Sequence, residues 1–434
     1  MVATQNTPIL FLYFCLSKSY TMKRFHLLLV FLLGMLRLTA QQKDQVANQF
    51  FTFLSEGKWE DAYTILSPKS QTKISVKALE QLWNNIGKQY GPWKSYSSDK
   101  VENVMGKSRL LISTNTFEYY YVDFKVSVNS EEKIERFSLH AVNSIPLNGD
   151  VLDSVTIAGG KLYGSLSLPT GIKKCPVVLI LPGSGPTDKD GDSKLLLPEY
   201  NHAYQFLAKA LAEKGIASLR FDKRGIGANK SFTDPAQSTL DNYDKDAITW
   251  LKYLKQNSRF SDVYIMGHSE GGVIAIDAAL AEPVKKVVLL STPAESLENL
   301  LVKQFKPYVH DSVVKTIPVI FRQLSNNEQP TVPNTLNSVF NKGSFDWLKS
   351  HNGVVPADRL AELRNTQVII INGTIDTNVP PAQAEMLHKS LPSSKLLLIP
   401  GMSHLLRMES DKEFIAIRPL ASELISAVSA FLKK

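Results

Sequence analysis

The chain is poor in cysteine: it has two in 434 residues, Cys15 and Cys175. A small secreted fold held together by disulfides needs several cysteines, so the sequence excludes that class. Cys15 lies in the first 40 residues, which we expect to be removed, so no intramolecular disulfide is expected in the mature chain. Cys175 begins an apolar stretch and is predicted to be a small, buried packing residue.

Basic residues are not gathered into any run interleaved with aromatic residues. The formal net charge is +8, but the first 40 residues hold four positive charges and no acidic residue. A nucleic-acid interface needs a basic patch or stripe. We therefore expect no nucleic-acid partner, and we interpret the remaining lysines and arginines as a solvated surface.

An apolar run long enough to span a membrane is also missing. Near the N-terminus, the segment MKR at 22–24 precedes an apolar stretch at 25–36, and small residues follow. This order is typical of a secretory signal. The apolar stretch is shorter than the roughly eighteen residues of a membrane helix. We expect residues 1–40 to be a leader and signal peptide, with translation starting at Met22 and cleavage after Ala40. The product is then periplasmic or secreted, with no stable membrane span.

The spacing of apolar residues changes from helical to strand-like within 43–145. Three segments have helical spacing: 44–57, 59–66 and 76–89. Apolar and polar residues then alternate over 122–128, as in a half-buried strand. Helices followed by an antiparallel sheet predict a small α+β domain at 43–145. The segment PLNGD at 146–150 is the expected linker.

Beyond residue 150, helical stretches alternate with short apolar strands. The helical stretches are 203–214, 243–255 and 272–281, and the strands are 216–220, 263–266 and 286–290. This alternation is typical of parallel βαβ units with helices on both faces of the sheet. We therefore predict an α/β domain with a mostly parallel sheet at 150–434.

The segment GHSEG at 267–271 lies between an apolar strand and a helical run. A sharp turn from strand to helix strains the backbone of its central residue, and flanking glycines leave room for the turn. Such a turn exposes a serine hydroxyl at the N-terminus of the helix. Ser269 is therefore a candidate nucleophile, whereas His268 is interpreted simply as the variable position of the turn.

Two more apolar strands lead into side chains that a serine nucleophile needs. The strand at 367–373 leads into Asp376, and the strand at 395–400 leads into His404. A serine hydroxyl attacks well only when an imidazole takes its proton, and a carboxylate fixes the tautomer of that imidazole. We predict that Ser269, His404 and Asp376 form a catalytic triad.

The predicted strand at 176–181 ends in the segment PGSGP at 182–186. A flexible turn there can aim backbone N–H groups at a developing oxyanion. We predict that one oxyanion donor is the N–H of Glu270, directly after the nucleophile. The other is the N–H of Ser184, with Gly183 or Gly185 as alternatives.

These motifs resemble those of α/β hydrolases, whose triad has the same chain order. The resemblance covers about 150–434. Three segments resemble the bacterial acyl-esterase and S33-peptidase-like branch: PGSGPTD at 182–188, RFDKRGIG at 220–227 and GMSH at 401–404. Residues 43–145 resemble the DUF3887 domain, which has an NTF2-like fold. The resemblance implies an α/β-hydrolase fold with helices on both faces of the sheet and a helical cap, preceded by a small α+β NTF2-like domain.

A long interval separates the strand at 286–290 from the strand at 367–373. Since a crossover needs far fewer residues, we predict a cap at about 295–355 that sets substrate choice. The alternative is a purely structural insertion.

No metal and no cofactor is expected, because histidines and cysteines lack metal-ligand spacing. The acidic segment DKDGD at 188–192 resembles a calcium-binding loop but does not complete the EF-hand pattern. We interpret it as a charged rim of the active-site mouth. Asp222 and Arg224 follow a strand and either contact substrate or form an internal ion pair.

The resemblance and the triad together imply a secreted serine hydrolase that cleaves a carboxylic ester of a small acyl substrate through an acyl-enzyme. A serine peptidase or acyltransferase is the alternative, because fold and triad do not choose between ester, amide and acceptor. A third hypothesis is a ligand-binding protein with a residual hydrolase domain. The acyl and alcohol groups, the role of the N-terminal domain and the oligomeric state stay open.

Overall fold

The computed structural model describes residues 44–90, 92–105, 108–117, 120–145, 150–193, 201–408 and 420–433. The chain divides into two compact units, Met1–Ile145 and Pro146–Lys434. The predicted leader, with Met22 and Ala40, and residues 146–149 of the predicted linker lie outside the described residues. Each unit is described by itself.

The first unit begins with helices that bury one apolar face. They are α2 (Gln45–Ser55), α3 (Trp59–Ile65), α4 (Pro68–Gln71) and α5 (Val76–Tyr90). Asp44 starts α2, because its Oδ1 accepts the N–H groups of Val46 and Ala47 at 3.0 Å. Phe50 and Phe51 lie on the buried face of α2.

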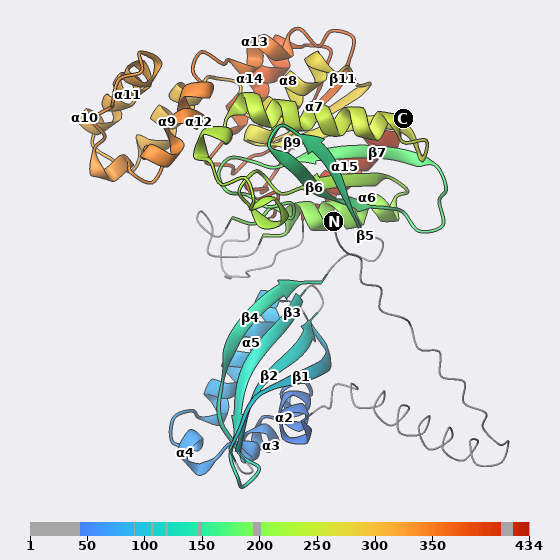
Figure 1. Cartoon of the computed structure of the whole chain (residues 1–434), viewed down its shortest axis with the longest axis vertical. Coiled ribbons are helices and arrows are strands. Elements are labelled where there is room, and N and C mark those ends of the chain that lie inside the picture. The colour runs from blue at the N-terminus through green and yellow to red at the C-terminus, as the bar shows by residue number, and fades with distance from the viewer. Residues whose placement is uncertain are drawn as a thin grey trace, which may run out of the picture. The chain divides into compact units, whose positions relative to one another are not determined.

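An antiparallel sheet with strand order β1-β2-β3-β4 completes this unit (Figure 1). Its strands are β1 (Trp93–Met105), β2 (Ser108–Phe117), β3 (Tyr120–Val128) and β4 (Ile134–Ser144). Alternate residues of β3 are buried. Phe124 of β3 packs on Phe51 of α2, with ring centroids 5.0 Å apart. The predicted α+β fold of this unit is confirmed.

The second unit contains an eight-stranded sheet with the order β12-β11-β10-β9-β7-β8-β6-β5. Its strands are β5 (Asp150–Ile157), β6 (Gly160–Ser167), β7 (Cys175–Leu181), β8 (Ala217–Phe221), β9 (Phe260–His268), β10 (Lys286–Leu290), β11 (Gln367–Gly373) and β12 (Lys395–Ile399). Every pair of neighbours among β12, β11, β10, β9, β7 and β8 is parallel. β6 pairs antiparallel with both β5 and β8. The sheet is therefore mostly parallel, as the sequence predicts.

Helices cover both faces of this sheet (Figure 1). They are α6 (Ala203–Glu213), α7 (Leu240–Gln256), α8 (Glu270–Ala281), α13 (Pro356–Leu360), α14 (Pro381–Ser390) and α15 (Ser422–Lys433). In β7, Val177 and Leu179 join a core with α7 and α8, whereas Val178 and Ile180 join a core with α6 and α15. Successive strand residues thus feed opposite cores, which explains the continuous apolar run. Cys175 is buried and free, as predicted.

The interval between β10 and β11 folds into a helical insertion with its own core. Its helices are α9 (Leu297–Phe305), α10 (Asp311–Val314), α11 (Thr316–Ser325) and α12 (Phe345–Ser350). The core of the insertion includes Leu301, Phe321 and Phe340. Helix α9 ends at Phe305, and the His310 side chain accepts the Ser312 N–H and caps α10. We call this insertion, residues 295–355, the cap.

Short 3₁₀ turns connect several of these elements. They are η1 (Gly227–Asn229), η2 (Pro235–Gln237), η3 (Asn334–Leu336) and η4 (Lys342–Ser344).

The cap joins the main core near α7, where the Leu240 N–H donates to Ser350 Oγ at 2.9 Å.

Candidate active site

Ser269 occupies a strained turn between β9 and α8. Its backbone angles are φ 55° and ψ −123°, a conformation that costs on the order of 1–3 kcal/mol for a residue other than glycine. A Cβ atom at Gly271 would lie 2.3 Å from the carbonyl oxygen of Leu181, and one at Gly267 would lie 1.9 Å from that of Gly271. Only glycine fits these two positions. The motif therefore builds the turn that the sequence predicts.

Asp376 and His404 meet after β11 and β12. His404 Nδ1 lies 2.9 Å from Asp376 Oδ2. Asp376 Oδ1 accepts the N–H groups of Asn378 at 3.0 Å and Val379 at 2.8 Å. Burial opposes ionisation of Asp376, but the hydrogen bonds and the attraction of His404 outweigh it and lower the pKa of this carboxyl. A buried, ionised carboxylate thus orients the imidazole.

Ser269 lies at the same edge of the sheet, yet in the described part of the chain no hydrogen bond joins its Oγ to His404. The ring of His268, directly before the serine, faces the ring of His404 with centroids 4.8 Å apart. Catalytic hydrogen bonds in free enzymes are often long and tighten only with substrate bound. The structure therefore joins Asp376 to His404 and places Ser269 directly after His268, whose ring faces His404.

The predicted oxyanion donors come from two different loops. Glu270 begins α8, and Ser184 follows the end of β7. Among the described residues, neither backbone N–H has a hydrogen-bond acceptor. The N–H of Gly183 is taken, because it donates to Tyr204 Oη at 3.1 Å. This contact removes Gly183 from the alternatives and leaves Ser184 and Gly185.

The side chain of Glu270 is buried in a network that the sequence does not predict. Its Oε2 lies 2.5 Å from Lys223 Nζ, and its Oε1 lies 3.1 Å from His351 Nε2 and accepts a hydrogen bond from Trp347 Nε1. Burial raises the pKa of Glu270, but Lys223 and His351 more than offset this and lower it. Trp347 and His351 belong to α12 and its C-terminal cap residue, so the cap is attached beside the nucleophile.

The acidic segment 188–192 is not an exposed rim, so that interpretation is wrong. Asp190 is buried and pairs with Arg220, while Asp192 is buried and lies 2.6 Å from His202 Nδ1. Asp188 Oδ1 accepts two backbone N–H groups of its own loop. These carboxylates therefore have structural roles: they hold the loop together and bind it to its surroundings.

Arg224 forms an internal ion pair, as one of the two alternatives predicts, and its partner is Asp246. Arg224 makes a bidentate pair with the buried Asp246, at 2.6 and 2.8 Å. Asp222 instead accepts the N–H groups of Lys189 and Ala228, both at 2.8 Å. Arg224 and Asp222 are therefore committed to structure, each with a partner from another part of the chain.

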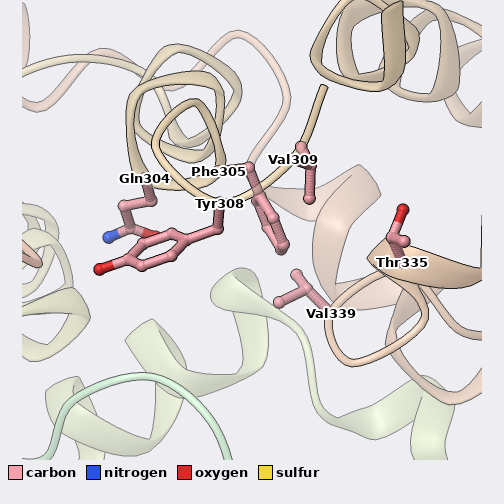
Figure 2. A pocket seen from close by; sticks show the side chains of 6 residues that line it. All are labelled: Gln304, Phe305, Tyr308, Val309, Thr335 and Val339. Carbon is pink, nitrogen blue, oxygen red and sulfur yellow. The ribbon is translucent and has the colours of Figure 1, made fainter. Parts of the chain in front are cut away.

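A pocket of about 430 Å³ lies in the cap (Figure 2). Its lining residues are Gln304, Phe305, Tyr308, Val309, Thr335 and Val339. Tyr308 is 81% exposed, while Phe305 and Val339 give the pocket apolar walls. Gln304 Nε2 donates to the carbonyl oxygen of Asn378 at 2.7 Å. The pocket therefore borders the loop that follows Asp376.

Within the described ranges, no group of three or more histidine, cysteine or acidic side chains is arranged to hold a metal ion. None of the described helices is long and apolar enough to cross a membrane.

Comparisons with known proteins agree with this architecture. Residues 197–411 match the family described as serine aminopeptidase, S33, and residues 47–137 match the protein of unknown function DUF3887. Esterase EstD of Thermotoga maritima is 27% identical over 273 residues, which cover 61% of this chain. The alignment spans 63% of the esterase's own length, less than two thirds.

Solved structures with a similar fold include two α/β proteins of low identity. Est1E from Butyrivibrio proteoclasticus is 19% identical, with a TM-score of 0.44 over 65% of this chain and 97% of that chain. The α/β hydrolase GrgF from Penicillium sp. sh18 is 16% identical, with a TM-score of 0.46 over 65% of this chain and 98% of that chain. These scores support no statement about substrate. The sequence matches and the observed sheet identify an α/β-hydrolase domain of the serine aminopeptidase S33 type, preceded by a DUF3887 domain.

Proposed function

We propose that the protein is a secreted serine hydrolase that cleaves a carboxylic ester. The observation that carries this proposal is the convergence of a strained serine turn with a bonded His404–Asp376 pair at one edge of the sheet. The turn exposes the Ser269 hydroxyl at the N-terminus of α8, and the pair supplies an oriented base.

In the proposed mechanism, Ser269 Oγ attacks the ester carbonyl carbon while His404 Nε2 takes the hydroxyl proton. Asp376 stabilises the imidazolium that forms. The N–H groups of Ser184 and Glu270 stabilise the oxyanion. The C–O bond to the alcohol then breaks as His404 returns the proton to the leaving oxygen. Water, deprotonated by His404, attacks the acyl-enzyme, and release of the acid restores Ser269.

Serine peptidase activity is the main alternative, because the matching family is named for an aminopeptidase. An aminopeptidase needs an acidic group to bind the α-amino group of its substrate. The carboxylate nearest Ser269 in the chain is that of Glu270, and Lys223 already neutralises it. This pairing and the relationship to an esterase favour the ester.

The pocket in the cap is suited to bind an apolar group of the substrate. Its walls are aliphatic and aromatic, and its bond from Gln304 to Asn378 fixes it beside the Asp376 loop. A volume of about 430 Å³ falls in the range of small-molecule sites. We assign this pocket to an apolar acyl or aryl part of the ester.

A panel of activated substrates tests the proposal. Nitrophenyl esters with acetyl, octanoyl and aryl acyl groups are compared with aminoacyl nitroanilides, each with wild-type protein and with Val339→Trp, which fills the pocket. We expect ester turnover only, with KM for the bulky esters raised about tenfold in the variant and KM for the acetate unchanged. Turnover of the nitroanilides at a similar kcat/KM would favour a peptidase. No turnover of any compound would favour a binding protein.

A further inference from the structure

Three hydrogen bonds connect the loop after β7 to the loop that carries His404. The Gly183 N–H donates to Tyr204 Oη at 3.1 Å. Tyr204 Oη lies 2.7 Å from His268 Nδ1. His268 Nε2 lies 2.9 Å from the main-chain oxygen of His404. We call this series the Tyr204–His268 chain.

The available donors fix the direction of every bond in this chain. A backbone N–H can only donate, so Tyr204 Oη accepts from Gly183 and has its own proton free for His268 Nδ1. Since Nδ1 accepts, the ring proton stays on Nε2, which donates to the carbonyl oxygen of His404. One arrangement of protons thus satisfies all the groups.

Burial keeps that arrangement unchanged over the working pH range. Tyr204 is 3% exposed and His268 is 7% exposed. Burial, helped by the nearby His404, lowers the pKa of His268 to about 3, so its ring is neutral at neutral pH. Burial also raises the pKa of the Tyr204 hydroxyl above its ordinary value. Neither group changes charge where a hydrolase of this kind operates.

We propose that Tyr204 and His268 are positioning residues that set the distance between the oxyanion loop, the nucleophile turn and the His404 loop. This inference rests on the proposed function. Gly183 precedes the oxyanion donor Ser184, and His268 precedes Ser269 in the chain. The hydrogen bonds therefore run between the direct neighbours of the groups that must meet at the substrate. A displacement of about 1 Å at such a site costs on the order of 100-fold in rate.

The start of α6, which carries Tyr204, can position these loops because other contacts hold it in place. Arg407, in the His404 loop, donates from Nε to Asn201 Oδ1 at 2.7 Å. The Tyr204 N–H donates to the Asp190 carbonyl oxygen at 3.1 Å. A Cβ atom at Gly191 would lie 3.2 Å from the Tyr204 ring, so the ring packs closely on this glycine.

Three variants of the full mature chain separate the parts of the Tyr204–His268 chain. Tyr204→Phe removes both bonds of the hydroxyl. His268→Gln keeps a donor near Nε2 for the His404 carbonyl, whereas His268→Asn keeps only an acceptor near Nδ1. On nitrophenyl acetate we expect kcat to fall about 10- to 100-fold in Tyr204→Phe and His268→Asn, with KM within twofold. His268→Gln should retain more activity than His268→Asn.

Tyr253→Phe is the matched control, because its hydroxyl bonds Asp153 between α7 and β5. It should keep the wild-type kcat. Values of kcat within twofold of wild type for both Tyr204→Phe and His268→Asn would overturn the inference. So would equal activity of the Gln and Asn variants, since the bond to His404 would then have no effect.

Amide hydrogen exchange supplies a readout that needs no turnover. Residues 401–408 should exchange faster in Tyr204→Phe and His268→Asn than in the wild type and in Tyr253→Phe. Unchanged exchange in both variants would contradict the inference. If the wild type hydrolyses no ester while exchange in 401–408 still rises in the variants, the proposed function fails and the link to the His404 loop stands.

Discussion

The Glu270 carboxylate lies 2.5 Å from the Lys223 ammonium group, and both side chains are buried directly beside the proposed nucleophile. An unpaired carboxylate at this place would oppose the negative charge that develops on an oxyanion. Lys223 cancels that charge, and its Nζ also lies 4.5 Å from the centre of the Tyr243 ring. The residue that offers a backbone N–H to the substrate therefore has its side chain fixed by a partner from the loop after β8.

Lys223→Met should destabilise the fold by about 3–5 kcal/mol, because it leaves a buried charge without its partner. In the wild type, the lowered pKa of Glu270 contributes stability that is fully present above its ordinary value of 4.5 and declines as the pH falls below that value. In the variant, burial without Lys223 should raise this pKa, so stability should fall as the pH rises through 5 to 7. Urea unfolding at several pH values measures both effects.

Lys303→Met is the control for this prediction, because the Lys303 side chain is 54% exposed where it pairs with Glu295. Its cost should stay below about 1 kcal/mol. A Lys223→Met protein that is as stable as this control would show that the buried pair does not matter for the fold.

Asp376→Asn should keep the fold and lower turnover by roughly 10⁴-fold, because an amide holds the wrong tautomer of His404. The asparagine oxygen can still accept the N–H groups of Asn378 and Val379, so the loop should be preserved. Steady-state kinetics on nitrophenyl acetate measure the loss, and Asp262→Asn, at an exposed pair with Lys285, serves as control. Activity within tenfold of wild type would mean that another carboxylate serves His404.

The edge that carries Ser269, Asp376 and His404 could be predicted, because each residue follows an apolar strand and parallel strands end at one edge. The sharp turn at Ser269 could also be predicted, from the glycines that flank it. The partners of Glu270 could not be predicted, since Lys223, Trp347 and His351 stand far from it in the chain.

A role for His268 beyond that of a variable turn position could not be predicted, because nothing in the local sequence points to Tyr204. Tyr204 lies on α6, and the folded sheet brings its hydroxyl to His268 Nδ1. The buried state of segment 188–192 could not be predicted for a similar reason. Its acidic letters suggest a charged surface, but Arg220 in β8 and the N–H groups before α6 bury and satisfy these carboxylates. Contacts between residues far apart in the sequence decide the roles of these side chains, and the spacing of apolar residues does not reveal those contacts.

Residues 150–434 alone should hydrolyse nitrophenyl acetate with a kcat/KM within tenfold of that of the chain from Gln41. Every proposed catalytic group lies in this segment, and its two main cores contain only its own residues. Both proteins are measured on the same ester after circular dichroism confirms folding. A folded truncation that loses more than about a hundredfold would show that the DUF3887 domain supplies catalytic geometry.

The exported protein should begin at Gln41 and should be released by osmotic shock without membrane retention. The basic and apolar regions at 22–36 predict cleavage after Ala40. Intact mass spectrometry of the released material measures the start. A mature chain that begins at Met1 or Met22 would contradict the predicted cleavage.

Reaction of the full mature chain with a fluorophosphonate tests the central claim most directly, because only a serine activated by a base reacts at a useful rate. Peptide mass spectrometry should find one label, on Ser269. Ser269→Ala should take up no label and lose turnover by about 10⁶-fold, whereas Ser426→Ala, an exposed serine on α15, should react like the wild type. A label on any other residue, or ester turnover by Ser269→Ala within tenfold of wild type, would contradict the account.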